Sequence, residues 1–170
     1  PFFWEQFASA YIDMRKFDMV KICIDTALRE AKKNKSFVPF QVKTVQGRYY
    51  VEKCYSDLMK GNCLAGEAID SIVNSFDAIM MYYNHPENNL YYVFKVVKFY
   101  SMIYSQIEDN MDIKEHSVYI EKSTIMSKKM NEYLEKNRDS IYFKKIEKWN
   151  ELLIDSINQS KEMIKELSSK

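Results

Sequence analysis

The side chains that most often carry catalysis or bind metal ions are scarce in this sequence and poorly spaced for either task. Its two histidines are His85 and His116, and its three cysteines are Cys23, Cys54 and Cys63. None of them belongs to an HExxH or CxxC pattern, in which ligands from neighbouring turns reach one metal ion. We therefore predict no metal site, and we expect His116 to be packed in the interior or at its rim.

Patterns for phosphate binding and nucleophilic catalysis are also missing. The chain has only 3 glycines, which are too few and too isolated to form a glycine-rich phosphate loop. It has no GxSxG motif and no Cys–His signature. The carboxylates Asp70 and Asp77 fall on a predicted helix, where a solvated side chain is the commoner arrangement. The sequence thus predicts a protein that is not an enzyme and uses no cofactor.

Aromatic residues with basic neighbours raise the alternative of stacking on nucleic acid. The basic residues concerned are Lys43, Arg48, Lys95 and Lys98. However, the tyrosines recur at the spacing of a buried helix face, and the whole chain has a net charge of +1. A core role for the aromatic residues is therefore favoured, and we expect proteins rather than nucleic acid as partners.

The scarcity of turn residues indicates which elements position these side chains. Among 170 residues there are 3 Gly and 3 Pro, whereas 46% are hydrophobic. Strands need frequent turns, which draw on Gly and Pro, so the composition predicts long helices and an all-α fold. The most apolar runs carry Asn74 and Asp77, or Lys95 and Lys98, so no membrane insertion is expected. The odd number of cysteines without CxxC spacing indicates reduced, mostly buried thiols in an intracellular, cytoplasmic protein.

Apolar residues at spacings of three and four predict about seven helices. A turn near Arg15–Lys16 separates the first two, and the third begins at Pro39. The signals Asn84-His85-Pro86-Glu87 and Asp112-Ile-Lys-Glu115 have the order of residues that starts a helix. The later predicted helices run from about Leu64 to Tyr83, from Asn84 through Ile107, from Asp112 to near Asn137, and from about Asp139 almost to the end.

The densest pattern lies in Trp4 to Leu28, where aromatic and small residues share one face of two predicted helices. The residues that carry it are Trp4, Phe7, Ala8, Tyr11, Phe17, Asp18, Val20, Ile24 and Ala27. In these types and spacings the stretch resembles a tetratricopeptide repeat. Phe7, Val20 and Ile24 are conservative departures from the family pattern, and Lys32 stands where the family has Pro.

A weaker internal repeat follows at a step of 48 residues. It aligns Ile24 with Ile72 and Ile120, and Ala27 with Ser75 and Ser123. The step exceeds the family's usual ~34 residues, which we interpret as longer helices. We predict three helix pairs, at about 1–38, 39–85 and 86–137, and a C-terminal amphipathic capping helix at 138–170. An antiparallel helical bundle is the alternative, because its apolar faces would look much the same.

The resemblance implies a partner-binding groove lined by the first helix of each pair. Carried over with the 48-residue step, its positions would be Phe2, Glu5, Ser9, Ile12 and Asp13, then Tyr50, Lys53, Asp57 and Lys60, and then Lys98, Ser101, Ser105 and Glu108. Ordinary solvent-exposed helix surface is the alternative for these residues. Family members that grip a C-terminal carboxylate use Lys and Asn where this chain has Glu5 and Ser9, so we expect no carboxylate clamp.

The function that the resemblance implies is a non-enzymatic protein–protein interaction module, a scaffold or adaptor in a larger multiprotein assembly. Its partners would be a peptide, a helix or a neighbouring subunit, and a peptide-sensing regulatory domain is the alternative. The chain opens at Pro1 directly with a helical pattern, so we expect a segment of a longer chain. Its Lys, Asn, Tyr and Ile richness indicates an AT-rich coding genome. Since large ciliary and axonemal assemblies contain many such arrays, a cytoskeletal or ciliary assembly is one expected setting.

Overall fold

The protein is built from helices. The computed structural model describes residues 2–34, 40–81, 83–85 and 89–169, and no strand occurs among them. The helices are α1 (Phe2–Asp13), α2 (Phe17–Lys33), α3 (Phe40–Leu58), α4 (Ala65–Met80), α5 (Leu90–Phe94), α6 (Val97–Ile107), η1 (Glu108–Asn110), α7 (Ile113–Lys136) and α8 (Phe143–Ser168). The predicted all-α class is therefore confirmed.

Two helix boundaries follow directly from local signals in the sequence. Arg15 has a φ of 55°, and the Lys16 N–H donates to the Tyr11 carbonyl at 2.9 Å, which closes the predicted turn between α1 and α2. At the start of α7, the Glu115 N–H donates to the Asp112 carboxylate at 2.8 Å, and the Asp112 N–H donates to Glu115 at 2.9 Å. This capping box satisfies amide groups that the first turn of a helix leaves unpaired.

The predicted fifth helix starts later than expected. Pro86 and Glu87, which belong to its predicted start signal, lie outside the described residues. Helix α5 begins at Leu90, and the Tyr91 N–H donates to the Asn89 side chain at 3.1 Å. An Asn directly before the first turn supplies the acceptor that a helix start requires, so Asn89 is the N-cap.

The structure corrects two further expectations about helix continuity. A turn at Lys95–Val96 separates α5 from α6, and both residues keep backbone angles close to those of a helix. The last helix begins at Phe143 instead of near Asp139. Before it, the Tyr142 N–H donates to Ser140 Oγ at 3.2 Å. Such side-chain bonds offer the backbone an alternative to the helix and delay its start.

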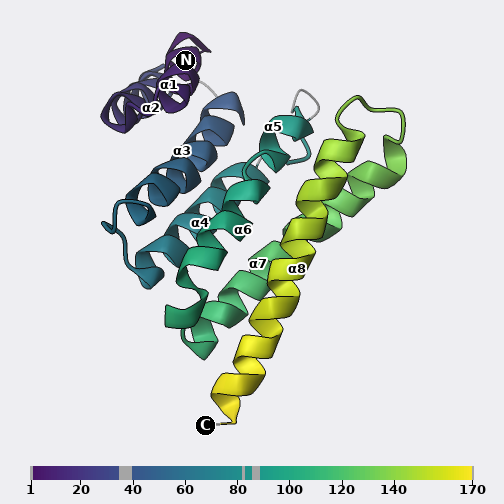
Figure 1. The fold of residues 1–170 in the computed structure, drawn as a ribbon. Coiled ribbons are helices and arrows are strands. Elements are labelled where there is room, and N and C mark those ends of the chain that lie inside the picture. Colours follow the sequence, from purple (N-terminus) through teal and green to yellow (C-terminus); the bar gives the residue numbers. More distant parts are fainter. Residues whose placement is uncertain (1, 35–39, 82, 86–88, 170) are drawn as a thin grey trace.

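The helices are stacked from the N-terminal pair at one end to the C-terminal pair at the other (Figure 1). Helix α1 packs on α2, α3 on α4, and α7 on α8. Contacts of α3 with α1 and α6, and of α6 with α8, make a row of α1, α3, α6 and α8, while α4 contacts α7. The main partner of α7 is thus α8, which lies beyond the predicted 86–137 unit, and the division into units stays a prediction.

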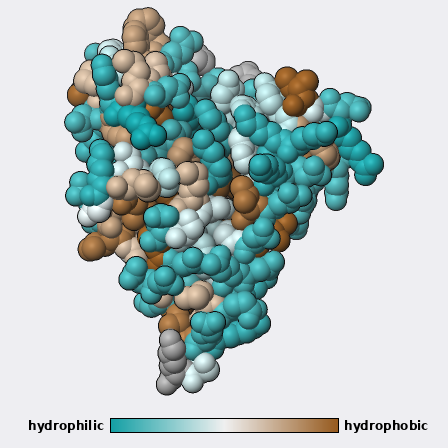
Figure 2. All heavy atoms as spheres, viewed as in Figure 1, coloured by the Kyte–Doolittle hydropathy of each residue, from teal (hydrophilic) through white to brown (hydrophobic). Residues whose placement is uncertain are grey.

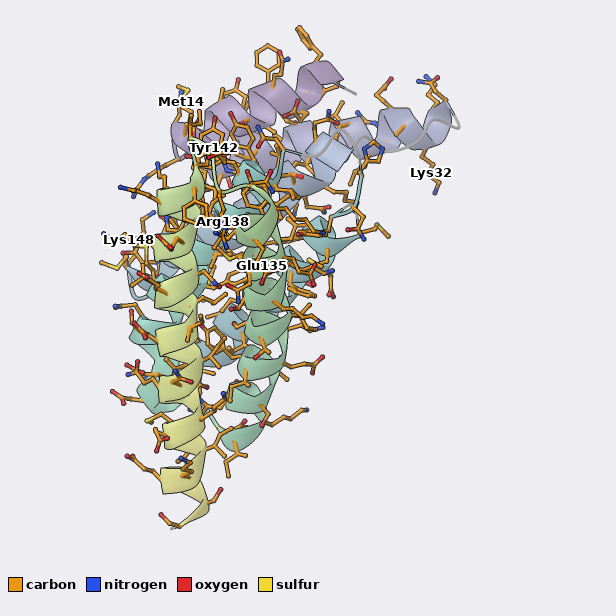
Figure 3. All side chains as sticks on the ribbon, turned by 90° about the vertical axis from the view of Figure 1, so that its right-hand side faces the viewer. Met14, Lys32, Glu135, Arg138, Tyr142 and Lys148 are labelled. Atoms are coloured by element: carbon orange, nitrogen blue, oxygen red, sulfur yellow. The ribbon has the colours of Figure 1, made fainter. Side chains whose placement is uncertain are left out.

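Most buried apolar side chains in the described part of the chain belong to two separate clusters. The larger one joins helices α3 to α8. The smaller one holds the α1–α2 pair against α3 and consists of Ala8, Ile12, Val20, Cys23, Ile24 and Val45. The N-terminal pair therefore has its own small core, to which α3 contributes Val45. Lys32, near the end of α2, extends away from the rest of the molecule (Figure 3).

Polar side chains cross the interface of α6, α7 and α8. His116 is fully buried, as predicted, and its Nδ1 lies 2.8 Å from Ser160 Oγ. Tyr119 and Ser156 share a hydrogen bond of 2.7 Å. The His116 Nε2 is buried without a hydrogen-bond partner among the described residues. A proton added to this ring would therefore place a charge in the interior with little compensation.

The free energy of unfolding should fall as the pH drops below about 6.5, because His116 is held neutral in the fold. Burial lowers the pKa of His116 from its usual 6.5, and the opposing effects of the Glu108 backbone, Glu115 and Asp112 are smaller. In this range the unfolded chain binds a proton that the folded chain does not, so stability is fully present above the unfolded pKa and is lost towards acid.

Urea unfolding from about pH 5 to about pH 8 tests this expectation, since an ordinary histidine titrates in that range. The change His116→Gln should remove part of the pH dependence. The matched change Gln159→Ala, at an exposed residue of α8 that does not titrate, should leave it in place. Equal slopes for the wild type and His116→Gln would contradict the assignment.

Candidate partner-binding groove

A cavity of about 510 Å³ opens between α1, α3 and the start of α5. Its lining comes from three separate parts of the chain and consists of Glu5, Gln6, Ser9, Ala10, Asp13, Gln41, Thr44, Val45, Arg48, Asn89 and Tyr92. Most of these side chains are polar. A volume of this size falls in the range of ligand-binding pockets. We call this cavity the groove.

Arg48 forms the rigid floor of the groove. Although it is charged, only 4% of its surface is exposed. Its Nη1 donates to Ser9 Oγ, its Nη2 to Asp13 Oδ1 and its Nε to Glu52 Oε1, each at 3.0 Å. Buried charges require such partners. One guanidinium therefore joins α1 to α3 and fixes the side chains of Ser9 and Asp13.

Two further side chains of the groove, Glu5 and Gln41, carry partly or fully buried oxygen atoms. Glu5 is half-buried; burial raises its pKa, and no charged neighbour among the described residues offsets that shift. Gln41 Oε1 is buried and has no hydrogen-bond partner among the described residues. Buried acceptors without a donor are costly, so a molecule that brings hydrogen-bond donors would gain free energy here.

The first set of predicted groove residues is brought together by this cavity. Glu5, Ser9 and Asp13 all line it. Ile12 does not belong to it, because its side chain is only 1% exposed and packs in the α1–α2 core. Phe2 begins α1, and its side chain lies outside the described part of the chain.

The second set lies on the opposite side of α3. Tyr50, Lys53 and Asp57 line a separate hollow of about 350 Å³ between α3 and α4. The nine residues from Gln41 to Tyr50 make about two and a half helical turns, which rotates the side chain to the far face. Lys53 donates to Asp57, and this bond raises the pKa of Lys53. Lys60 is exposed in the turn after α3.

The third set is divided between two environments on α6 and η1. Lys98 Nζ lies 4.5 Å from the centre of the Phe99 ring, and burial lowers the pKa of Lys98. Ser105 is exposed, whereas Ser101 Oγ and Glu108 Oε2 are buried. None of these four side chains lines the groove.

Sequence reasoning missed the α3 side of the groove. Gln41, Thr44 and Arg48 face α1 there, together with Asn89 and Tyr92 from the start of α5. A signal was available: Arg48 is followed four residues later by Glu52, which is the spacing of an ion pair along a helix. An arginine held in this way can also bind a neighbouring helix.

The remaining surface offers few other kinds of site. No three or more His, Cys, Asp or Glu side chains in the described ranges are grouped to hold a metal ion. Within the same ranges no helix combines the length and the apolar character needed to cross a membrane. The face in Figure 2 is mainly hydrophilic, with hydrophobic side chains in small patches. The chain matches no protein-family model, no curated protein and no solved structure.

Proposed function

We propose that this chain is a non-enzymatic protein–protein interaction module, a helical scaffold or adaptor that binds a segment of its partner in the groove. The observation that carries the proposal is the groove itself, which has a fixed arginine floor and one buried acceptor, Gln41 Oε1, without a donor among the described residues. A peptide segment supplies N–H donors along its backbone and basic or amide groups on its side chains. Binding there would therefore provide a donor for Gln41 Oε1.

The packing of the helices supports a tetratricopeptide-like array within this proposal. In such an array the first helices of successive pairs line the binding face. The groove is lined in this way, because its walls are α1 and α3, the first helices of two neighbouring pairs. The row of α1, α3, α6 and α8 extends this face along the molecule, and it ends on α8, the second helix of the α7–α8 pair, in place of a first helix.

Pre-organisation is the second property that favours a binding role. Arg48 makes three hydrogen bonds and is almost fully buried. The groove therefore keeps its shape without a partner, and less conformational entropy is lost on binding. A surface cleft of freely rotating side chains would lack this advantage.

A selection of random displayed peptides against the purified chain tests the proposal with two matched variants. Gln6 is exposed and lines the groove, whereas Gln159 is exposed on α8 and lines none of the hollows described here. We expect selected peptides to lose at least about tenfold in affinity with Gln6→Arg, equivalent to about 1.4 kcal/mol. They should bind Gln159→Arg unchanged.

Two results would contradict the proposed binding of a partner segment. If no peptide is enriched, or if the enriched peptides bind Gln6→Arg and the wild type equally, the groove does not bind a partner segment. Circular dichroism of both variants establishes that each is folded before its affinity is compared.

A further inference from the structure

Two cysteines lie close together where α3 turns into α4. Cys54 belongs to the last part of α3, and Cys63 directly precedes Leu64, the N-cap of α4. Their sulfur atoms are 3.9 Å apart. Both side chains line the hollow that also contains Tyr50. The remaining cysteine, Cys23, is buried in the separate α1–α2 core.

The two thiols differ in accessibility and in the secondary structure that carries them. Cys54 is buried, whereas Cys63 is partly exposed. Cys63 also lies outside any helix. A disulfide bond has a length of about 2.05 Å, so the sulfur atoms must approach by roughly 2 Å. The non-helical segment that carries Cys63 can provide this movement without disturbing α3.

The turn between the cysteines holds them in register. The Gly61 N–H donates to the Leu58 carbonyl and the Asn62 N–H to the Asp57 carbonyl, both at 2.9 Å. Gly61 has a φ of 71°, the left-handed conformation that glycine adopts readily. This turn ends α3 and brings the chain back, so that Cys63 returns to the level of Cys54.

We propose that Cys54 and Cys63 form a thiol–disulfide modification site, oxidised by exchange with a low-molecular-weight disulfide such as oxidised glutathione. The Cys63 thiolate attacks one sulfur of oxidised glutathione, which breaks its S–S bond and releases one reduced glutathione. The Cys54 thiolate then attacks the Cys63 sulfur and releases the second glutathione. Two protein thiols are oxidised, one glutathione disulfide is reduced to two thiols, and the protons pass to the released thiolates.

The environment of the sulfurs determines the expected rate. Burial raises the pKa of both thiols, that of Cys54 to about 12. Only a thiolate attacks a disulfide. The exchange should therefore be slow at neutral pH and should accelerate as the pH rises. This site is independent of the groove, which lies on the other side of α3.

Alkylation and mass spectrometry after incubation with oxidised glutathione test the proposal. In the wild type and in Cys23→Ser, we expect an internal disulfide that joins the peptides containing Cys54 and Cys63. The Cys54→Ser variant should stop at the first step, with glutathione retained on Cys63. The Cys63→Ser variant should form neither the internal disulfide nor a glutathione adduct, because the remaining thiol of the pair, Cys54, is buried.

The wild-type peptide map decides the question even if a variant does not fold. Glutathione that stays on Cys63 of the wild type, a bond that involves Cys23, or a bond between two molecules would each overturn the proposal. A second readout is thermal unfolding: oxidation should raise the melting temperature of the wild type and of Cys23→Ser. It should leave that of Cys63→Ser unchanged.

Discussion

Replacing Arg48 by Met should lower the free energy of unfolding by about 3 kcal/mol, the cost typical of breaking a buried ion pair. The change keeps much of the side-chain volume but removes the donors to Ser9, Asp13 and Glu52. Glu52 is then a carboxylate with only 17% side-chain exposure and no cation at 3.0 Å. The Asp13 side chain is 65% exposed, so water compensates most of its loss.

Urea unfolding of Arg48→Met and of a matched variant provides the measurement. Arg29 is exposed on α2, so Arg29→Met should change stability by no more than about 0.5 kcal/mol. Arg48→Lys should fall between the two, since an ammonium group cannot present the fixed fork of a guanidinium. Equal losses for Arg48→Met and Arg29→Met would show that Arg48 does not join α1 to α3.

The same substitution at two glycines should have opposite effects. At Gly47, in α3, an added Cβ would lie 2.5 Å from Ile79 Cγ2 and 3.2 Å from the Ser75 carbonyl oxygen. Neither atom can move easily, because one is attached to a β-branched carbon and the other is backbone. At Gly66, in α4, the nearest atom is Glu115 Oε1 at 3.3 Å, the far end of a flexible side chain.

We expect Gly47→Ala to destabilise the protein by about 1–2 kcal/mol, because an overlap cost of about 1–3 kcal/mol exceeds the gain of up to ~1 kcal/mol from helix propensity. Gly66→Ala should stabilise it by about 0.5 kcal/mol, since the unfolded chain loses freedom and the Glu115 carboxylate has to move by only a few tenths of an ångström. Urea unfolding of both variants measures the difference in sign. Stabilisation by Gly47→Ala would mean that α3 and α4 are packed less closely than the structure indicates.

The helices could be predicted because their signals are local. The turn at Arg15–Lys16 and the capping box at Asp112 depend on residues a few positions apart. A packed His116 was expected because this residue belongs to no metal-binding pattern. The exact starts of α5 and α8 were predicted less well. Asn89 caps α5 and Ser140 delays α8 through side-chain hydrogen bonds, and several similar polar residues near each of them could have formed such a bond instead.

The groove could be predicted only on one wall, because the first and second helices do not follow the same sequence step. A step of 48 residues aligns the second helices well, since Ile24 and Ile72 are both buried. It does not also align the first helices, because the segment 14–16 joins α1 to α2, whereas the longer segment 59–64 joins α3 to α4. The α3 residue that contacts Ser9 and Asp13 is Arg48, whereas the 48-residue step pairs these two residues with Asp57 and Gly61. Contacts between helices, and not a sequence step, determine this register.

The N-terminal helix pair, with its own small core, should behave as a separate cooperative unit in hydrogen exchange. Amides of α1 and α2 should exchange through a sub-global opening that leaves α4, α7 and α8 protected. Because the groove has one wall in that unit and the other in α3, it exists only while the pair is docked. A molecule bound in the groove would therefore slow exchange throughout α1 and α2, by the factor that its concentration and affinity dictate. Binding in the groove and docking of the N-terminal pair on α3 are therefore coupled in one equilibrium.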